Sequence, residues 1–231
     1  MYRHRHRGEG DHMSVFVGLG AAQVPRLSVL LLSHNNSRTI GQCAQSWLAQ
    51  TQSAVEVLVQ DCGSIDNTPY LLAALGEAEQ RVRVCFAATT TEQHAYANLL
   101  SAARAPYVVF ASADVAAPPT LVERATEVLD TELDKAAVFS FKAGAAPSTR
   151  SMSATELLAC VCLAPDDFAS AGVVLRRDGL IQTLRDDRSA DAPSYAMWLQ
   201  ACRDGAPTLL PELAVKGLGP AADHVTVAQV L

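Results

Sequence analysis

The sequence predicts an α/β fold, a mostly parallel mixed sheet with helices on both faces. Between residues 27 and 132, short apolar runs alternate with amphipathic segments of helical spacing, as in parallel strands joined by crossover helices. The run Val29–Leu32 is apolar throughout, which is typical of a strand covered on both faces. Polar loops with Asn35, Asp61 and Asp114 follow these runs, so a ligand crevice is expected beyond the carboxyl ends of the strands.

The expected elements follow one another in a regular order. Ser37 is a candidate N-cap for a helix whose apolar residues recur at spacings of three and four. Val55–Val59 is the expected second strand, and Asp66 or Asn67 is suited to cap the helix after it. Pro69 is acceptable in the first turn of that helix. The remaining elements are expected at 82–86 (strand), 92–104 (helix), 107–111 (strand) and 118–132 (helix).

Composition and charge exclude several classes of protein. At 231 residues, 49% of them hydrophobic, the chain is expected to form a single domain or one domain with an appended lobe. The net charge of −6 argues against nucleic-acid binding, which needs a basic face. No apolar run approaches the roughly 20 residues of a transmembrane segment. The six cysteines lack the spacing of a disulfide framework, so reduced thiols and a cytoplasmic location are predicted.

The loops after the expected strands carry recognisable motifs: Leu-Ser-His-Asn at 32–35, Ala-Gln-Thr at 49–51, Asp-Cys-Gly-Ser-Ile-Asp-Asn-Thr at 61–68 and Ser-Ala-Asp at 112–114. Together these motifs resemble family 2 of the inverting glycosyltransferases, which have the GT-A (Rossmann-like) fold. Residues 32–35 are similar to the Pro-Thr-Tyr-Asn-like loop after the family's first strand, and residues 49–51 to its Gln-Thr segment. Residues 61–68 match its Asp-x-Gly-Ser-x-Asp-x-Thr loop, and residues 112–114 correspond to its Asp-x-Asp motif. The resemblance covers residues 26–135 well and the rest of the chain loosely.

The resemblance implies a domain organisation and an activity. Residues 26–231 are expected to form one domain, with a nucleotide-sugar half at 26–135 and an acceptor-side half at 136–231, after a disordered arm at 1–25. The implied reaction moves a sugar from a nucleoside diphosphate donor to an acceptor hydroxyl with inversion, and a UDP-sugar is the expected donor. The sequence predicts neither the acceptor nor the oligomeric state.

Three later segments resemble elements of the family's acceptor side. Residues 172–180 resemble the strand that returns to the site, 195–205 the helix that begins at the catalytic acid, and 209–216 the final strand. Residues 144–153 are rich in Gly, Ala, Pro and Ser and are expected to form a loop.

The nucleotide contacts implied by the resemblance lie in the loops that follow the strands. Asp61 stands in the position of the family's base-recognising aspartate, although a carboxylate that caps the helix from Thr68 would carry the same pattern. Asp66 is also suited to a helix cap, and Asn35 either contacts the nucleotide or shapes the turn. The expected set is Ser33, Asn35, Asp61, Gly63, Ser64, Asp66, Ser112 and Ala113.

A divalent ion is also implied. The family's Asp-x-Asp motif holds an ion that neutralises the leaving diphosphate, and oxygen ligands suit Mg²⁺ or Mn²⁺. Here Asp114 is retained, whereas Ser112 stands at the first acidic position. Asp114 is therefore the expected metal ligand, with weak binding in the absence of nucleotide. His224 is either an additional ligand or a surface histidine.

The family's usual pair of acidic residues for the catalytic base is absent from this sequence. An inverting transferase needs a carboxylate that deprotonates the acceptor hydroxyl, and the family places it in a Glu-Asp pair about four residues before a Trp. Counting back from Trp198 gives Pro193 and Ser194. Asp191 is the nearest acid upstream and the predicted base, with a merely solvated loop at 185–191 as the alternative.

A basic contact to the phosphates is either missing or supplied from elsewhere in the chain. Family members often place Arg or Lys beside an Asn, where this chain has Ala-Tyr-Ala-Asn at 95–98. Arg176 or Arg177 is the candidate replacement. These departures leave three functions open: an active transferase, a non-catalytic homologue that binds a nucleotide or a partner, and a different reaction on the same fold.

Overall fold

The structure is a computed structural model that describes residues 16, 24–87, 91–139, 153, 155–156, 173–178, 180, 206–210 and 213–218. The strands are β1 (Leu27–Ser33), β2 (Val55–Asp61), β3 (Val82–Phe86), β4 (Tyr107–Ser112), β5 (Val115–Ala116), β6 (Lys135–Phe139), β7 (Val173–Arg176), β8 (Ala206–Leu209) and β9 (Lys216–Gly217). The helices are α1 (Ile40–Leu48), α2 (Thr68–Ala78), α3 (Glu92–Ala102) and α4 (Leu121–Thr131).

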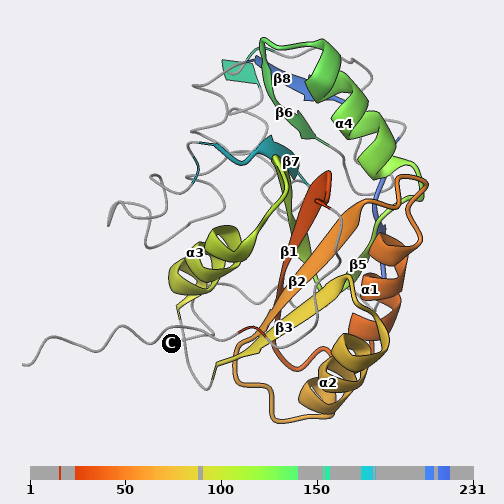
Figure 1. The fold of residues 1–231 in the computed structure, drawn as a ribbon, viewed down its shortest axis with the longest axis vertical. Helices are drawn as coiled ribbons and strands as arrows, with labels where there is room; N and C mark the ends of the chain where they lie inside the picture. The colour runs from red at the N-terminus through yellow and green to blue at the C-terminus, as the bar shows by residue number, and fades with distance from the viewer. Residues whose placement is uncertain are drawn as a thin grey trace, which may run out of the picture.

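Seven of these strands form one sheet in the order β3-β2-β1-β4-β7-β6-β8 (Figure 1). β1 pairs in parallel with β2 and β4, and β2 pairs in parallel with β3. β7 is antiparallel to both β4 and β6, and β8 is parallel to β6. The predicted mostly parallel mixed sheet is therefore confirmed. The chain runs outward from β1 to β3 and returns to β4 on the other side of β1, which creates a topological switch point there.

Helices cover both faces of the sheet, α1, α2 and α4 on one side and α3 on the other (Figure 1). Neighbouring side chains of β1 enter opposite cores, so Val29 and Leu30 are both fully buried. This explains why the strand is apolar at successive positions. On the α3 side, Tyr96 packs edge-on against Phe110, with ring centroids 4.9 Å apart.

The start of α1 differs from the prediction. The helix begins at Ile40, and its N-cap residue Thr39 makes no side-chain capping hydrogen bond. Ser37, the predicted cap, lies in the preceding loop and donates its amide to Asp66 Oδ2 at 3.1 Å. The prediction of Ser37 as the cap was wrong because contact with a second loop, rather than local helix chemistry, fixes this residue.

The later segments are only partly described. The strand expected within 172–180 is present as β7, while the helix expected at 195–205 lies outside the described residues. The single strand predicted at 209–216 is wrong, since β8 ends at Leu209 and β9 begins at Lys216. Pro211 lies between them in sequence and has no N–H for a strand ladder. Among the helices that the structure describes, none has the length and hydropathy needed to cross a membrane.

Candidate functional site

Three loops meet at the carboxyl edge of the parallel strands, where the strand order reverses. Ser33 ends β1 opposite Asp61 of β2, and Leu32 of β1 lies opposite Ser112 of β4. The Cys62 amide donates to the Ser33 carbonyl at 2.8 Å, which joins the first two loops. The nucleotide and metal contacts predicted from the sequence therefore lie along one edge of the sheet.

Asp61 is buried at the start of the β2–α2 loop, with 3% of its surface exposed. Its carboxylate accepts from the Ser64 hydroxyl at 2.5 Å and from the Ser64 amide at 3.1 Å. Gly63 between them has a φ of 83°, in the left-handed region that glycine adopts without strain. The N-cap of α2 is Asn67, so Asp61 folds its own loop rather than capping the helix. A carboxylate offers about four acceptor positions, so Asp61 retains capacity for another donor.

Asn35 shapes the loop that follows β1. Its φ of 55° lies in the left-handed region, where Asn is enriched among non-glycine residues. Its amide donates to Ser64 Oγ at 2.8 Å, and its side-chain oxygen accepts from the Ile65 amide at 2.9 Å. The Ser64 hydroxyl thus accepts from Asn35 and donates to Asp61. Of the two roles considered for Asn35, this geometry supports the one in the turn.

Asp66 ties the loop after β1 to the start of α2. Its carboxylate accepts from the Ser37 amide at 3.1 Å and from the amide of Thr68, the first helical residue, at 2.9 Å. Slight desolvation favours its neutral form, but these hydrogen bonds outweigh that effect and lower the pKa of Asp66 below its usual value. Ser33, which is buried, donates its hydroxyl to Asn36 Oδ1 at 3.3 Å within the same loop.

The turn between β4 and β5 carries Ser112, Ala113 and Asp114. Ser112 Oγ donates a hydrogen bond to Asp114 Oδ1, so the hydroxyl at the first acidic position supports the remaining carboxylate. Ala113 belongs to the hydrophobic core and is 3% exposed, so its side chain packs inward. Asp114 is half-buried, and its carbonyl accepts from the Leu218 amide at 2.7 Å, which brings β9 beside the turn.

Two cysteines lie beside these carboxylates as neutral thiols. Burial, together with the negative charge of Asp114, raises the pKa of Cys43 to about 12. Burial, together with the charges of Asp61 and Glu92, raises the pKa of Cys62 to about 12. Because the thiolate is the reactive form, neither cysteine is expected to act as a nucleophile at neutral pH.

The described residues supply too few ligands to hold a metal ion by themselves. None of them form a group of three or more His, Cys, Asp or Glu side chains that could hold an ion. Asp114 offers one carboxylate, whereas Mg²⁺ and similar ions need about six oxygen ligands. A divalent ion therefore fits here when a bound diphosphate supplies further oxygens, in keeping with the predicted weak binding without nucleotide.

His34 is a further candidate for contact with the nucleotide, and the sequence motif alone did not identify it. Its exposed ring has Nδ1 3.1 Å from the Cys62 carbonyl oxygen and Nε2 3.0 Å from Asn35 Nδ2. These contacts place the ring between the loops after β1 and β2. Its position in residues 32–35 corresponds to the Tyr of the similar motif, and this shared aromatic character was the available signal. A flat ring there is suited to stacking on a base.

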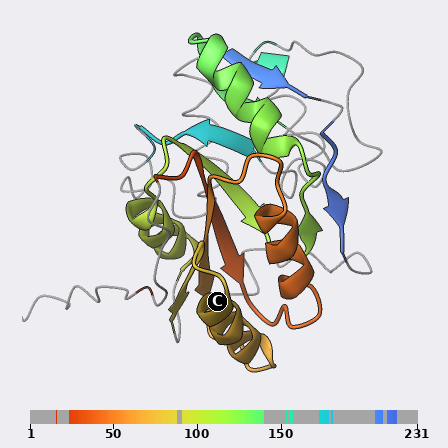
Figure 2. The ribbon, with the colours of Figure 1, turned by 45° about the vertical axis from the view of Figure 1, so that its right-hand side comes forward.

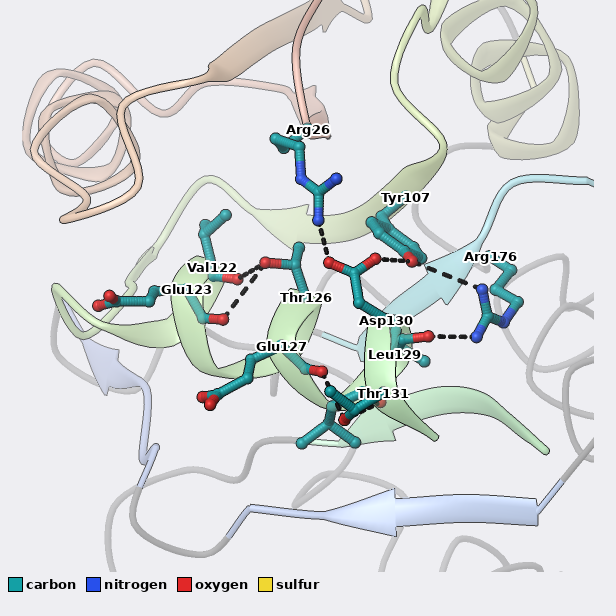
Figure 3. A network of polar contacts seen from close by, with 11 residues as sticks. Arg26, Tyr107, Val122, Glu123, Thr126, Glu127, Leu129, Asp130, Thr131 and Arg176 are labelled. Carbon is teal, nitrogen blue, oxygen red and sulfur yellow. Dashed lines mark hydrogen bonds and ion pairs between the residues drawn. The ribbon is translucent and has the colours of Figure 1, made fainter. Parts of the chain in front are cut away.

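Arg176 and Arg177 do not reach this edge, so the suggestion that either one binds phosphate was wrong. β7 is antiparallel to β4 and places Arg176 opposite Tyr107, at the amino edge of the parallel strands. Figure 3 shows Arg176 donating to the Leu129 carbonyl at the end of α4. Arg177 donates to the Ala103 carbonyl at 2.7 Å. The direction of β7, which a local pattern does not reveal, explains the error.

The remaining predicted site residues lie outside the described part of the chain. They are Asp191, the predicted base, and His224, which is either a metal ligand or a surface histidine. Pro193, Ser194 and Trp198, from which the position of the base was counted, lie there too. The role of Asp191 therefore stays a prediction, and both alternatives for His224 stay open.

Comparison with known proteins agrees with the geometry of the loops. Residues 28–175 match the family model described as glycosyl transferase family 2. The uncharacterized glycosyltransferase alr2836 of Nostoc sp. is 31% identical over 107 residues, 46% of this chain and 33% of that protein. The uncharacterized glycosyltransferase YibD of Escherichia coli is 30% identical over 112 residues, 48% of this chain and 33% of that protein. The aligned part is thus about a third of the length of these curated relatives.

Solved structures share the fold at low sequence identity. A Pyrobaculum calidifontis mannosyltransferase in complex with GDP-Man and Mn²⁺ has a TM-score of 0.63 and 18% identity, covering 90% of this chain and 61% of that one. TarS of S. aureus with UDP-GlcNAc has a TM-score of 0.66 and 15% identity, covering 86% and 60%. Glucosyl-3-phosphoglycerate synthase of Mycobacterium tuberculosis with Mn²⁺, UDP and phosphoglyceric acid has a TM-score of 0.60 and 22% identity, covering 89% and 76%. Since the family model spans well over half of the chain, the chain belongs to glycosyltransferase family 2 and has the GT-A fold.

Proposed function

We propose that this protein transfers a sugar from a nucleoside diphosphate donor to an acceptor hydroxyl, with inversion at the anomeric carbon. The observation that carries the proposal is the buried Asp61 carboxylate, held by Ser64 at the switch point of the sheet. Asp114 follows β4, on the other side of β1 from Asp61. Two carboxylates on either side of the central strand suit the two ends of a nucleotide, one at the base and one at the diphosphate.

Asp61 is the proposed base-recognition residue, with uracil as the proposed base. Its free acceptor positions suit an N–H of a nucleobase, and its burial strengthens that hydrogen bond because water competes less. The exposed ring of His34 is suited to stack on the same base. Solved structures with the same fold contain UDP-GlcNAc, UDP or GDP-Man, so uridine and guanosine nucleotides are both worth testing.

Asp114 is the proposed metal ligand. A bound Mg²⁺ or Mn²⁺ ion supplies positive charge that stabilises the leaving diphosphate. The Ser112 hydroxyl holds the Asp114 carboxylate in place through its hydrogen bond. Two structures of the same fold contain Mn²⁺, which supports the use of a metal in this site.

Asp191 is the proposed catalytic base, as the nearest acid upstream of Trp198. Loss of the proton acceptor typically lowers turnover by about 10²–10⁴-fold, whereas donor binding relies on other residues. Asp191→Asn should therefore lower turnover with little change in donor affinity. Full turnover in this variant would move the role to Asp186, to Asp187 or to the substrate.

A non-catalytic nucleotide-binding homologue is the second candidate. It is favoured by Ser112 at the first acidic position of the metal motif and by Pro193 and Ser194 at the usual positions of the base. Both candidate functions require the loop held by Asp61 and Ser64, because this loop is proposed to bind the nucleotide and takes no part in the transfer of the sugar.

Two measurements on the wild-type protein test the proposal. Calorimetry with UDP-sugars and GDP-sugars, with and without Mn²⁺, should reveal binding of at least one donor. The protein should also release nucleoside diphosphate from that donor. Release should be slow when water is the acceptor and faster when an acceptor hydroxyl is supplied. Binding without any turnover would favour the non-catalytic candidate. A folded protein that binds no donor would contradict both candidates.

A further inference from the structure

The basic side chains that the structure describes divide into two groups. Most of them serve the fold: Arg26, Arg81, Arg83, Arg104, Arg124, Arg176 and Arg177 donate to carboxylates or to backbone carbonyls. By contrast, the side chains of Arg38 and Lys216 make neither a hydrogen bond nor an ion pair with any described residue. Arg38 lies in the loop after β1 and Lys216 in β9, so both belong to segments at the carboxyl edge.

The pairing of β5 with β9 places Lys216 close to the candidate metal ligand. In this antiparallel ribbon, Ala116 lies opposite Lys216, and the Leu218 amide donates to the Asp114 carbonyl at 2.7 Å. The two strands lie side by side in Figure 2, β9 in blue beside the green β5. Lys216 therefore lies two residues along the chain from Leu218, the partner of Asp114, a displacement of about 7 Å along a strand, which a lysine side chain can span. Its side chain is exposed, so the ammonium group is available to a ligand.

Among the described residues at the carboxyl edge, Arg38 and Lys216 are the only Arg or Lys side chains that could neutralise a diphosphate. Ser112 stands where the similar motif has a carboxylate, which weakens the hold on a metal ion. Residues 95–98 lack the Arg or Lys found in similar proteins, and Arg176 and Arg177 are engaged at the opposite edge. An unpaired lysine beside Asp114 is suited to this role, because an ammonium group binds phosphate as a compact point charge.

We propose that Lys216 binds the diphosphate of the donor from across the β5–β9 ribbon, and neutralises part of its charge without a metal ion. This proposal rests on the proposed function of the site as a nucleoside diphosphate site. It assigns to β9 a part in ligand binding, in addition to its pairing with β5.

Calorimetry in EDTA tests the proposal with two pairs of probes, uridine with UDP and guanosine with GDP. The wild-type protein should bind one diphosphate more tightly than its nucleoside. Lys216→Gln should weaken the binding of the diphosphate by about 10-fold, the lower end of the range for a charge-assisted hydrogen bond. It should leave the affinity for the nucleoside unchanged. Lys216→Arg should keep most of the preference for the diphosphate. Arg124→Gln, an exposed basic residue paired with Glu127 on α4, is the matched control and should behave like the wild type.

The possible outcomes separate this proposal from the function on which it rests. If the wild type binds no nucleoside and no nucleoside diphosphate, both are overturned. If the wild type prefers the diphosphate and Lys216→Gln keeps the whole preference, only the role of Lys216 is overturned. An equal loss for nucleoside and diphosphate would show a structural effect and would also overturn it. Loss of the preference in Arg38→Gln, with retention in Lys216→Gln, would assign the role to Arg38 instead.

Discussion

The two edges of the parallel sheet hold their charged side chains in different ways. At the amino edge, the Glu56 carboxylate, with 1% of the side chain exposed, binds Arg83 at 3.1 Å and Arg104 at 2.9 Å. At the carboxyl edge, Asp61 and Asp66 accept from amide and hydroxyl groups. Neither of these two carboxylates pairs with an Arg or Lys within the described residues. The comparison suggests that carboxylates paired with Arg hold the scaffold, while carboxylates without a cationic partner remain able to bind a ligand.

A second amino-edge cluster supports this division. Asp130 accepts from the Tyr107 hydroxyl at 2.6 Å and from Arg26 (Figure 3). Arg26 and Arg176 both lie over the Tyr107 ring, at 5.9 and 5.7 Å from its centroid. Burial and the charge of Asp130 raise the pKa of Tyr107, which keeps the phenol a hydrogen-bond donor. The cluster joins β4, β7, α4 and the residue just before β1, so its role is in the fold.

The largest expected effect comes from breaking the buried cluster at the amino edge. Glu56→Ala leaves Arg83 and Arg104 without their carboxylate and should lower the free energy of unfolding by about 3–5 kcal/mol. Urea unfolding would measure this loss, and nucleotide affinity in the folded variant should hardly change. Glu79→Ala, which breaks the more exposed pair with Arg81, is the control and should cost about 1 kcal/mol or less. Equal losses in the two variants would contradict the contrast drawn between the edges.

An intermediate effect is expected when the proposed metal ligand at the carboxyl edge is changed. Mn²⁺ should raise the affinity of the wild type for UDP. Asp114→Asn should lower the UDP affinity measured with Mn²⁺ by roughly 10-fold or more, with little change in stability. Ser112→Asp should act in the opposite direction by restoring a second carboxylate. Titrations with and without Mn²⁺ measure both changes. Tight Mn²⁺ binding by the nucleotide-free protein that survives Asp114→Asn would count against the assignment.

The smallest expected effect concerns Asp66 and depends on pH. Its folded pKa lies below the unfolded value, so its ionised form stabilises the fold above the usual carboxyl pKa of about 4. That stabilisation is lost as the pH falls toward the lowered folded value. Because Asp66 is exposed, Asp66→Asn should cost at most about 1 kcal/mol at pH 7. The gap between wild type and variant should shrink at pH 3, and an unchanged gap at both pH values would oppose this account.

The carboxyl edge was predictable where local pattern decides the structure. The apolar runs indicate β1, β2, β3 and β4, and the polar residues after them mark the strand ends. Parallel direction then brings Ser33, Asp61 and Ser112 to one edge, because crossover helices return each strand in the same sense.

Contacts between segments distant in the sequence were not predictable. Ser37 has the chemistry of a helix cap, yet the partner of its amide is Asp66, 29 residues away. Arg176 was misplaced because nothing in its own segment reveals that β7 runs antiparallel to β4. The pairing that sets Lys216 beside Asp114 joins segments about 100 residues apart, and a strand of two residues carries no periodicity.

The most direct test of the nucleotide site compares UDP binding by the wild type and by Asp61→Asn. Asparagine removes the charge and keeps one side-chain oxygen, which can accept one of the two hydrogen bonds from Ser64. The contacts of Asn35 with Ser64 and Ile65 remain, so the loop should stay folded. We predict a loss of about 1–3 kcal/mol in UDP affinity, a small decrease in melting temperature from the lost Ser64 contact, and wild-type affinity in the control Glu79→Gln. A folded Asp61→Asn protein that binds UDP as tightly as the wild type would contradict base recognition by Asp61.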